Sequence, residues 1–431
     1  MLITVDCLRN DYFTWYHMPQ TFNLIKDWAF FTNAFSHGPD TPSSFPTIMT
    51  SAYSLMYGDY PRLGPMRTAL AEILSKNGLI TCGITQNTFH GRALGYARGF
   101  KHFYNFVSPR GVERMRFALK TPSFALEILV KKALFGMEAF IIPAPLITGL
   151  AIKMLKDKLL GRRFFLWIHY MDIHHPFGLN LLNLLTLKKP LGRARRLFST
   201  RWGIRQDLKS DIIDCYVAAL RQVDSAISAL LEFLDGAGVL DDTLVVITAD
   251  HGEEFFEHGA FGHGCKLYDE LLHIPLVIYA QDFVKRRSKF DGLVGLIDVP
   301  TTVLSALGIS KPRNFMGNEL LSEEGDGQPT FRPYVISEVG HGEREPFKSN
   351  RRWYKYSLRT KRWKLIYRPH TGQIELFDLK NDPREIHDIS DERPDIVDEL
   401  MKPLRKHIRM ELVSVIKAKA RKISKHALVR L

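Results

Sequence analysis

Residues 244–254 read LVVITADHGEE, and this stretch decides the fold more than any other part of the chain. Its first six residues are apolar or β-branched, a composition typical of a buried β-strand. The strand would end at Asp250 and His251, and Gly252 permits a sharp turn directly after them. An adjacent carboxylate and imidazole can bind one divalent cation. A structural turn with a surface Asp is the alternative for the same residues.

Two further predicted strands deliver polar side chains in the same way. Residues 2–6 form an apolar run that ends at Asp6, and residues 164–170 (FFLWIHY) lead into a polar cluster. The cluster consists of His169, Asp172, His174 and His175. Ligands bind at the carboxyl ends of the strands in open α/β sheets, so we expect these side chains to lie near Asp250.

The first 327 residues alternate predicted strands with predicted helices. Further strands are predicted at residues 79–85, 274–279 and 293–296, and helices at residues 68–77, 210–234 and 300–307. Gly236 and Gly308 follow the last two of these helices, as is common at helix ends. We therefore predict one α/β domain at residues 1–327, in which helices sandwich a large, mostly parallel sheet.

The pattern changes near residue 328. Short segments that alternate apolar with polar residues lie at 334–338, 354–360, 363–367 and 374–378. They predict a small antiparallel sheet, with a tight turn at Thr371 and Gly372. We assign residues 328–393 to a small C-terminal α+β subdomain and residues 394–431 to a basic helical tail.

The charge balance favours anionic partners. The 431 residues include 59 Lys or Arg and 46 Asp or Glu, which gives a formal net charge of +13. Such a chain suits an anionic ester substrate, nucleic acid or an anionic membrane surface. The interleaving of basic and aromatic residues that marks nucleic-acid surfaces is missing, so no nucleic-acid partner is expected.

Residues 109–163 are interpreted as a basic and apolar helical insertion. Basic residues bracket the apolar run 139–152, a pattern of helices that cover the site or make peripheral contact with an anionic membrane; a lid or a dimer interface is an equal alternative. No apolar run reaches the roughly 20 residues of a spanning helix. The N-terminus lacks a signal-peptide pattern and the four cysteines form no CxxC pair. We therefore expect a cytoplasmic protein, membrane-associated where the insertion binds lipid.

Residues 40–46 (DTPSSFP) predict the start of a helix. Thr41 suits the N-cap position and Pro42 the first helical position. Because a helix N-terminus binds anions, a hydroxyl there can attack phosphorus or sulfur while backbone N–H groups hold the oxyanion. Two alternatives are that Thr41 only caps the helix, and that Ser43 or Ser44 is the attacking residue.

Three further basic side chains are candidates for substrate contact. Near the first strand, Arg9 can meet an anionic substrate or pair with Asp11. His263 and Lys266 lie in a glycine-containing segment after residue 254 that suits a loop closing on an anion.

Together these segments resemble the sulfatase family, within the alkaline phosphatase superfamily, almost from end to end. The resemblance is carried by ITVDCLRND (3–11), TPSSFPTIMTS (41–51), HYMDIHHPF (169–177), TADHGEEFFEHGAFGHGCKLYDELLHIPLVIY (248–279), LIDVPTTVLSALGI (296–309) and RTKRWKLIYRPHTGQIELFDLKNDPREIHDIS (359–390). It implies that residues 1–327 are the catalytic domain.

The resemblance also implies roles for individual residues. Asp6, Asp250 and His251 would bind one divalent metal ion, with Ca²⁺ or Mg²⁺ expected first and Mn²⁺ or Zn²⁺ as alternatives. Thr41 would contact the metal and act as the nucleophile. Two histidines, His174 and His263, would contact the ester, and in the expected mechanism one or the other protonates the leaving group. Lys266 would be a second substrate contact beside His263.

Departures from the family pattern affect the expected chemistry. Sulfatases convert a Cys or Ser at the position of Thr41 into formylglycine, and Thr cannot follow that route. Ser43 and Phe45 replace the usual Pro and Arg of the maturation motif. At the metal site, Cys7 stands where many sulfatases carry a second Asp. The metal would then have fewer protein ligands, or Asp11 would supply the missing one.

The expected function is hydrolysis of sulfate or phosphate esters through a Thr nucleophile. One alternative is a phosphodiesterase, or a transferase of phosphate-linked head groups, that acts on a lipid or glycan. A non-catalytic anion-binding protein is the second alternative.

Overall fold

A computed structural model of the chain describes residues 1–107, 120–135, 141–179, 183, 197, 205–281, 288–321, 329–340 and 354–428. Within these residues, nine strands form a large sheet in the order β11–β2–β10–β6–β1–β5–β3–β4, and β9 pairs with β2. The strands are β1 (Leu2–Val5), β2 (Ala29–Phe35), β3 (Ile80–Thr85), β4 (His102–Asn105), β5 (Phe164–Tyr170), β6 (Val245–Ala249), β9 (His273–Ile274), β10 (Leu276–Tyr279) and β11 (Lys289–Gly295).

The middle of this sheet is parallel, as predicted. Strands β6, β1, β5, β3 and β4 pair in parallel, whereas β10 runs antiparallel to both β6 and β2. The register aligns Val5 with Tyr170 on one side and with Ala249 on the other. Asp6 and Asp250 therefore leave neighbouring strands at the same edge.

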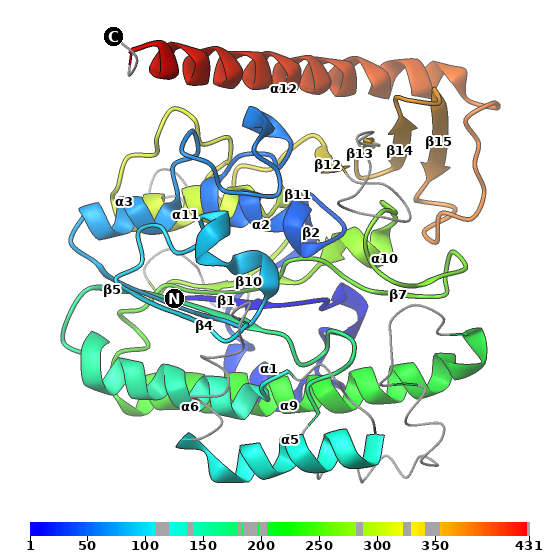
Figure 1. The fold of residues 1–431 in the computed structure, drawn as a ribbon. Helices are drawn as coiled ribbons and strands as arrows, with labels where there is room; N and C mark the ends of the chain where they lie inside the picture. Colours follow the sequence, from blue (N-terminus) through cyan, green and yellow to red (C-terminus); the bar gives the residue numbers. More distant parts are fainter. Residues whose placement is uncertain are drawn as a thin grey trace.

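Helices cover both faces of the sheet (Figure 1). One face carries α1 (Pro19–Ile25), α6 (Ala144–Met154) and α9 (Lys209–Gly236), with α5 (Pro122–Phe135) outside them. The other face carries α2 (Thr41–Thr50), α3 (Leu70–Lys76) and α11 (Asp298–Ala306). Helix α9 buries a continuous apolar stripe that includes Ile212, Leu220 and Leu231, because apolar residues recur at helical spacing along it. The predicted sandwich is confirmed.

Part of the predicted insertion lies outside the described residues, namely residues 109–119 and 136–140. Across the residues that the structure describes, no helix is long and apolar enough to cross a membrane.

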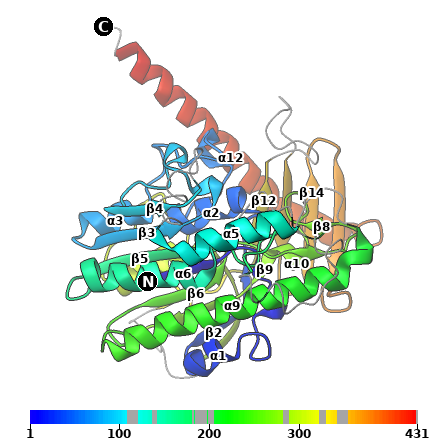
Figure 2. The same ribbon diagram turned by 60° about the horizontal axis from the view of Figure 1, so that its bottom comes forward.

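The small sheet predicted in the C-terminal part is confirmed. Its strands β12 (Val335–Val339), β13 (Lys355–Arg359), β14 (Trp363–Arg368) and β15 (Gln373–Asp378) pair antiparallel in chain order. Gly372 has φ 75° in the turn between β14 and β15, a conformation that glycine adopts without strain. Helix α12 (Pro394–Leu428) packs on this sheet and then extends beyond the body of the molecule (Figure 2).

A buried ionic cluster attaches α12 to the rest of the chain. Nε2 of His407 lies 2.9 Å from Glu338 Oε2 on β12 and 3.1 Å from Glu411 Oε1. Glu338 also accepts the backbone N–H of Leu55 at 2.7 Å, and Tyr356 donates to Glu411 at 2.9 Å. Although burial alone lowers it, the two carboxylates raise the pKa of His407 to about 10.

This cluster predicts a pH-dependent stability. Because the pKa of His407 in the folded state lies above the ordinary value of 6.5, its stabilising effect is complete below that value and is lost as pH rises through about 10. At pH 6.5, His407→Gln should lower the free energy of unfolding by about 3 kcal/mol, as expected for a broken buried pair. Denaturant unfolding of both proteins between pH 6 and 10 measures this difference. A difference that stays constant up to pH 10 would contradict the assignment.

Candidate active site at the carboxyl edge of the sheet

Two carboxylates and one imidazole converge at the carboxyl edge of the large sheet. Asp6 follows β1 and the pair Asp250–His251 follows β6, and all three are fully buried. Nε2 of His251 lies 3.5 Å from Asp6 Oδ1 and 3.6 Å from Asp250 Oδ2. One ligand atom from each residue lies within 4.8 Å of the others. The structure thus brings together the three residues predicted to bind metal.

Local backbone contacts orient His251. Its Nδ1 donates to the carbonyl oxygen of Gly252 at 2.8 Å, so the Nε2 atom is the one that faces the two carboxylates. Gly252 is required here for a different reason than predicted, because a Cβ on it would lie 2.0 Å from the carbonyl oxygen of Glu270. The close approach of this neighbouring segment excludes any larger residue.

Thr41 lies beside this trio but does not cap α2, contrary to the prediction. Asp40 is the N-cap and accepts the backbone N–H of Ser43 at 3.0 Å, which makes Thr41 the first helical residue. The Thr41 hydroxyl is therefore not used for capping. It donates to Asp250 Oδ2 at 3.1 Å and lies 3.5 Å from Asp6 Oδ2 and from His251 Nε2.

The same cap changes the expected oxyanion contacts. The N–H groups of Ser43 and Ser44 both donate to Asp40, and Pro42 has no N–H. The start of α2 therefore offers fewer backbone donors than predicted. The hydroxyls of Ser43 and Ser44 donate to backbone or side-chain oxygens of residues 40 and 41. Of the three hydroxyls, only that of Thr41 meets the carboxylates of Asp6 and Asp250 in the described part of the chain.

Two residues to which no catalytic or metal-binding role was assigned, Asn87 and His169, contact Asp6. The side-chain amide of Asn87, just beyond β3, donates to Asp6 Oδ2 at 2.9 Å and to Thr41 Oγ1 at 3.2 Å. His169 on β5 places Nε2 3.2 Å from Asp6 Oδ2, while its Nδ1 lies 2.9 Å from Thr4 Oγ1. The polar exit of β5 indicated His169, whereas no pattern around Asn87 marked it.

Cys7 also borders the cluster. Its thiol donates to Asp6 Oδ1 at 3.1 Å and lies 3.5 Å from His263 Nδ1. Burial and the neighbouring carboxylates, Glu253 foremost, raise its pKa well above the usual range, so the sulfur stays protonated. Asp11, the other residue considered for the metal shell, instead pairs with Arg9 at the surface.

The two predicted ester-contacting histidines lie next to each other at this edge. The ring centroid of His263 lies 4.3 Å from that of His251 and 5.1 Å from that of His174. Nδ1 of His263 is held 2.9 Å from Glu253 Oε1. Both histidines therefore border the cluster: a ring nitrogen of His174 lies within 4.8 Å of Asp6, and one of His263 within 4.8 Å of His251.

The two other predicted substrate contacts are taken up by protein carboxylates. Arg9 donates to both oxygens of Asp11 at 2.9 and 2.8 Å and to Glu257 at 2.7 Å, which is the ion-pair alternative. Lys266 donates to Glu254 at 2.9 Å and to the carbonyl of His258 at 2.7 Å. Neither side chain joins the Thr41 cluster among the described residues, because carboxylates nearby pair with each cation.

Electrostatics explain why this cluster suits a cation. Burial and the charge of Asp6 raise the pKa of Asp250 to about 6. Burial would also raise the pKa of Asp6, yet the nearby histidines, His174 foremost, hold it well below its usual range. Two adjacent buried carboxylates are costly without a positive charge between them. Two carboxylates and an imidazole form a donor set that a divalent cation fits.

Two family models match the chain. The sulfatase family model matches residues 1–309, and the model of the C-terminal part of N-sulphoglucosamine sulphohydrolase matches residues 256–414. Arylsulfatase K from Rattus norvegicus is 33% identical over 208 residues, which cover 46% of this chain and 35% of the relative. The same enzyme from Bos taurus is 31% identical, with 46% and 37% covered. The match thus spans little more than a third of these relatives.

Solved structures share the fold over nearly the whole chain. A phosphonate monoester hydrolase from Silicibacter pomeroyi superposes with a TM-score of 0.74 at 18% identity and covers 96% of this chain and 95% of its own. A second solved structure, of a protein in complex with its substrate D-glucosamine-2-N,6-O-disulfate, superposes with a TM-score of 0.72 at 18% identity. The match covers 95% of this chain and 97% of that protein. At these identities the likeness concerns the fold alone.

Proposed function

The chain belongs to the sulfatase family, and we propose that it hydrolyses sulfate or phosphate esters with a divalent metal ion and Thr41 as nucleophile. One observation carries the proposal. The Thr41 hydroxyl, at the start of α2, lies 3.1 Å from Asp250 and 3.5 Å from both Asp6 and His251. A hydroxyl that meets a buried two-carboxylate and imidazole set is arranged for activation rather than for helix capping.

The residues of the cluster take separate roles in this proposal. Asp6, Asp250 and His251 would hold the metal, with Ca²⁺ or Mg²⁺ the ions that best suit oxygen-rich ligands. When bound, a divalent ion lowers the pKa of a neighbouring hydroxyl and polarises the ester oxygens. Asp250 Oδ2 accepts the hydrogen of Thr41 Oγ1 at 3.1 Å, so it is placed to receive the proton of the attacking hydroxyl.

The ester then reacts in two steps. Thr41 Oγ1 gives its proton to Asp250 and attacks in line with the leaving alcohol, to which His174 or His263 donates a proton. Asn87 donates to Thr41 Oγ1 and holds Asp6, so it aims the nucleophile. Water then attacks the covalent ester and gives a proton to the same histidine, while Asp250 returns its proton to the departing Thr41 oxygen.

A second candidate function is transfer to an acceptor alcohol. Threonine cannot become formylglycine, so the Thr41 ester is released only when an external oxygen attacks the bound phosphorus or sulfur. Water and an alcohol compete for that step. A transferase of phosphate-linked head groups to a lipid or glycan would use the same residues.

A panel of esters tests the proposal. The purified protein would be assayed with aryl sulfate, aryl phosphate, aryl phosphodiester and aryl phosphonate, each with added Mg²⁺ or Ca²⁺ and after EDTA treatment. We expect metal-dependent release of the aryl alcohol from at least one ester. An added acceptor alcohol that appears in a new ester by mass spectrometry identifies transfer. No release from any ester with either cation would favour a non-catalytic anion-binding protein.

Asn87 provides a test of nucleophile positioning. Asn87→Ala removes the donor to Thr41 Oγ1 and Asp6, and kcat should fall about 10- to 100-fold, the range for loss of a residue that orients a metal ligand. Asn105, whose amide donates only to the carbonyl of Asn87 in the described residues, gives the matched variant Asn105→Ala. That control should keep most of the activity. Equal losses in the two variants would point to a general disturbance of this loop instead.

A further inference from the structure

The outer face of α12, the side that points away from the small sheet, carries an excess of positive charge. Six basic side chains between residues 405 and 421 are exposed, namely Arg405, Lys406, Arg409, Lys417, Lys419 and Arg421. Within the described residues, none of the six pairs with a carboxylate. Glu411 is the one acidic residue in this stretch of sequence, and it is buried against His407. No acid in the segment therefore offsets the six charges at its surface.

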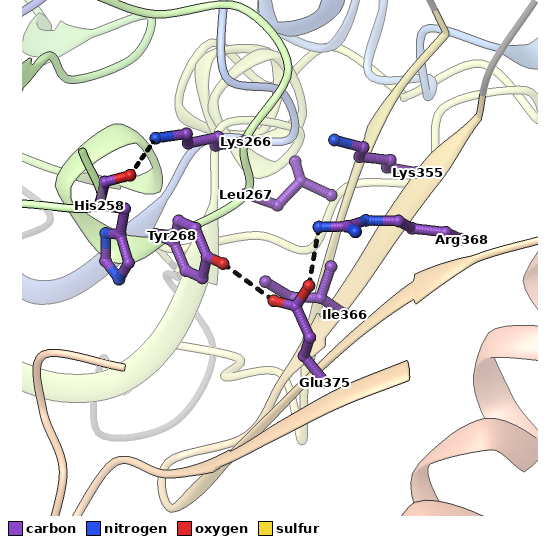
Figure 3. Close-up of a pocket in the computed structure, with 8 residues that line it drawn as sticks. All are labelled: His258, Lys266, Leu267, Tyr268, Lys355, Ile366, Arg368 and Glu375. Atoms are coloured by element: carbon purple, nitrogen blue, oxygen red, sulfur yellow. Dashed lines mark hydrogen bonds and ion pairs between the residues drawn. The ribbon is translucent and has the colours of Figure 1, made fainter. Parts of the chain in front are cut away.

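Basic side chains in other parts of the molecule have acidic partners. At the junction of the main domain and the small sheet, Arg368 donates to Glu375 at 2.7 Å (Figure 3), and Lys266 lies 2.8 Å from Glu254. Such pairs leave little charge for a further ligand. The basic groups of α12 differ from them because their charge faces solvent, where it attracts anions.

Large apolar side chains are exposed on the same outer face. They are Met410 (37% exposed), Leu412 (59%), Val413 (48%) and Ile416 (65%). Leu412 and Ile416 lie one helical turn apart, while Arg409 and Lys417 lie one turn before and one turn after Val413. The apolar group is therefore bordered by basic residues. Its four side chains gain free energy when another apolar phase covers them.

The inner face of α12 holds this segment in place. The backbone N–H of Tyr57 donates to Ser414 Oγ at 3.0 Å, and Ala418 is only 2% exposed. Figure 1 shows α12 along one side of the molecule, with its outer face directed away from the small sheet and the main domain. The outer face can thus meet a flat surface while the inner contacts remain.

We propose that the outer face of α12 binds the surface of a membrane that contains anionic lipids. The basic side chains meet the charged head groups, and the four apolar side chains enter the boundary with the acyl chains. Long basic side chains suit this position, because their stems lie along apolar groups while their charged ends stay in water. A membrane supplies both the negative charge and the hydrocarbon that this face lacks.

Two other occupants fit the same face less well. A second copy of the chain would bring six like charges against six, which is repulsive. Nucleic acid would satisfy the charges, but it offers no hydrocarbon to cover Leu412 and Ile416, and residues 405–421 contain no Phe, Trp or Tyr that could stack on a base. Charge and apolar exposure together therefore favour the lipid surface.

Vesicle sedimentation with the full chain tests the proposal. Vesicles of equal parts phosphatidylserine and phosphatidylcholine should sediment the protein, and pure phosphatidylcholine vesicles should not. Added salt should weaken this binding by screening the charges. Arg409→Gln/Lys417→Gln should weaken partitioning about 30-fold, since each basic residue near an anionic surface contributes about a factor of five. Leu412→Ser/Ile416→Ser should weaken it at least about tenfold, because two apolar side chains no longer enter the lipid.

Two matched double variants serve as controls. Lys361→Gln/Arg362→Gln removes the same net charge from exposed residues of the small-sheet region that already pair with acids. Leu126→Ser/Leu129→Ser makes the same apolar change on α5, where the two leucines are 62% and 65% exposed. Figure 1 shows α5 on the side of the large sheet opposite to α12, so one flat membrane does not contact both helices. Both controls should bind as the parent does.

The outcomes separate the possible occupants. A parent that does not bind anionic vesicles overturns the proposal, as does binding that the α5 variant loses and the folded α12 variants keep. Sedimentation velocity without lipid gives the oligomeric state. A dimer that the α12 variants dissociate, with no vesicle binding, would assign this face to a second copy instead. None of these measurements depends on turnover at Thr41, so failure of the proposed hydrolase function would leave them unchanged.

Discussion

Thr41→Ala should reduce kcat/KM by at least about 10³-fold, because removal of a covalent nucleophile leaves only binding and electrostatic effects. The hydroxyl is the part of Thr41 that meets Asp250, Asp6 and His251, so its loss removes the attacking atom and nothing else from the cluster. Initial rates with the best ester of the panel, together with the accumulation of a phosphorylated or sulfated enzyme, give the measurement.

Two comparisons make this test specific. Thr41→Ser keeps the oxygen and should retain measurable activity and a trapped covalent ester. Ser44→Ala removes a neighbouring hydroxyl that donates to the backbone of α2, and it should change kcat little. Circular dichroism and thermal unfolding establish that each variant is folded. A folded Thr41→Ala protein with the parent rate would remove Thr41 from the mechanism and return attention to Ser43 and Ser44.

Asp250→Asn should abolish metal binding at concentrations that saturate the parent. Loss of a residue that merely orients a metal ligand weakens affinity about 10- to 100-fold, so loss of a ligand itself should weaken it at least about 100-fold. Plasma mass spectrometry of the metal-to-protein ratio, after equilibration with Ca²⁺ or Mg²⁺, measures this directly. Activity should fall in parallel. Asp11→Asn is the control, since Asp11 pairs with Arg9 and should be dispensable for metal.

The stability of the metal-free protein gives an independent readout for Asp250. Its pKa of about 6 in the folded chain lies above the ordinary value of 3.8, because burial and Asp6 disfavour its charge. Ionised Asp250 therefore destabilises the metal-free protein at pH 7, and the penalty disappears as pH falls below 3.8. After EDTA treatment at pH 7, Asp250→Asn should be at least as stable as the parent. A marked loss of stability would show that Asp250 serves the fold instead.

Several elements could be predicted because their signal is local. The runs that became β1, β5 and β6 are continuously apolar and bounded by polar residues, which is the pattern of a strand buried on both faces. Strand β2 was missed because Thr32 and Asn33 interrupt its apolar residues. Its partners β9, β10 and β11 all lie more than 200 residues later in the chain, at residues 273–295.

The candidate site was also predictable only where its residues lie next to elements with a local sequence signal. Asp6, Thr41, Asp250 and His251 stand at the ends or starts of predicted elements, where the fold class directs them to one edge. Arg9 and Lys266 looked equally suitable, yet Glu257 and Glu254 take up their charges. Such partners can be identified only when the chain is folded, because an ion pair depends on distance in space.

The amino-acid sequence by itself determined that two carboxylates, a histidine and a threonine would meet at the carboxyl edge of a mostly parallel sheet. Apolar runs that form strands, and the polar residues at their ends, are local features that can be recognised in the sequence. Only the tertiary structure decided that Asp40 rather than Thr41 caps α2, that Asn87 holds Asp6, and that Lys266 pairs with Glu254. Hydrogen bonds reach about 3 Å through space, and no spacing along the chain encodes which donor will find which acceptor.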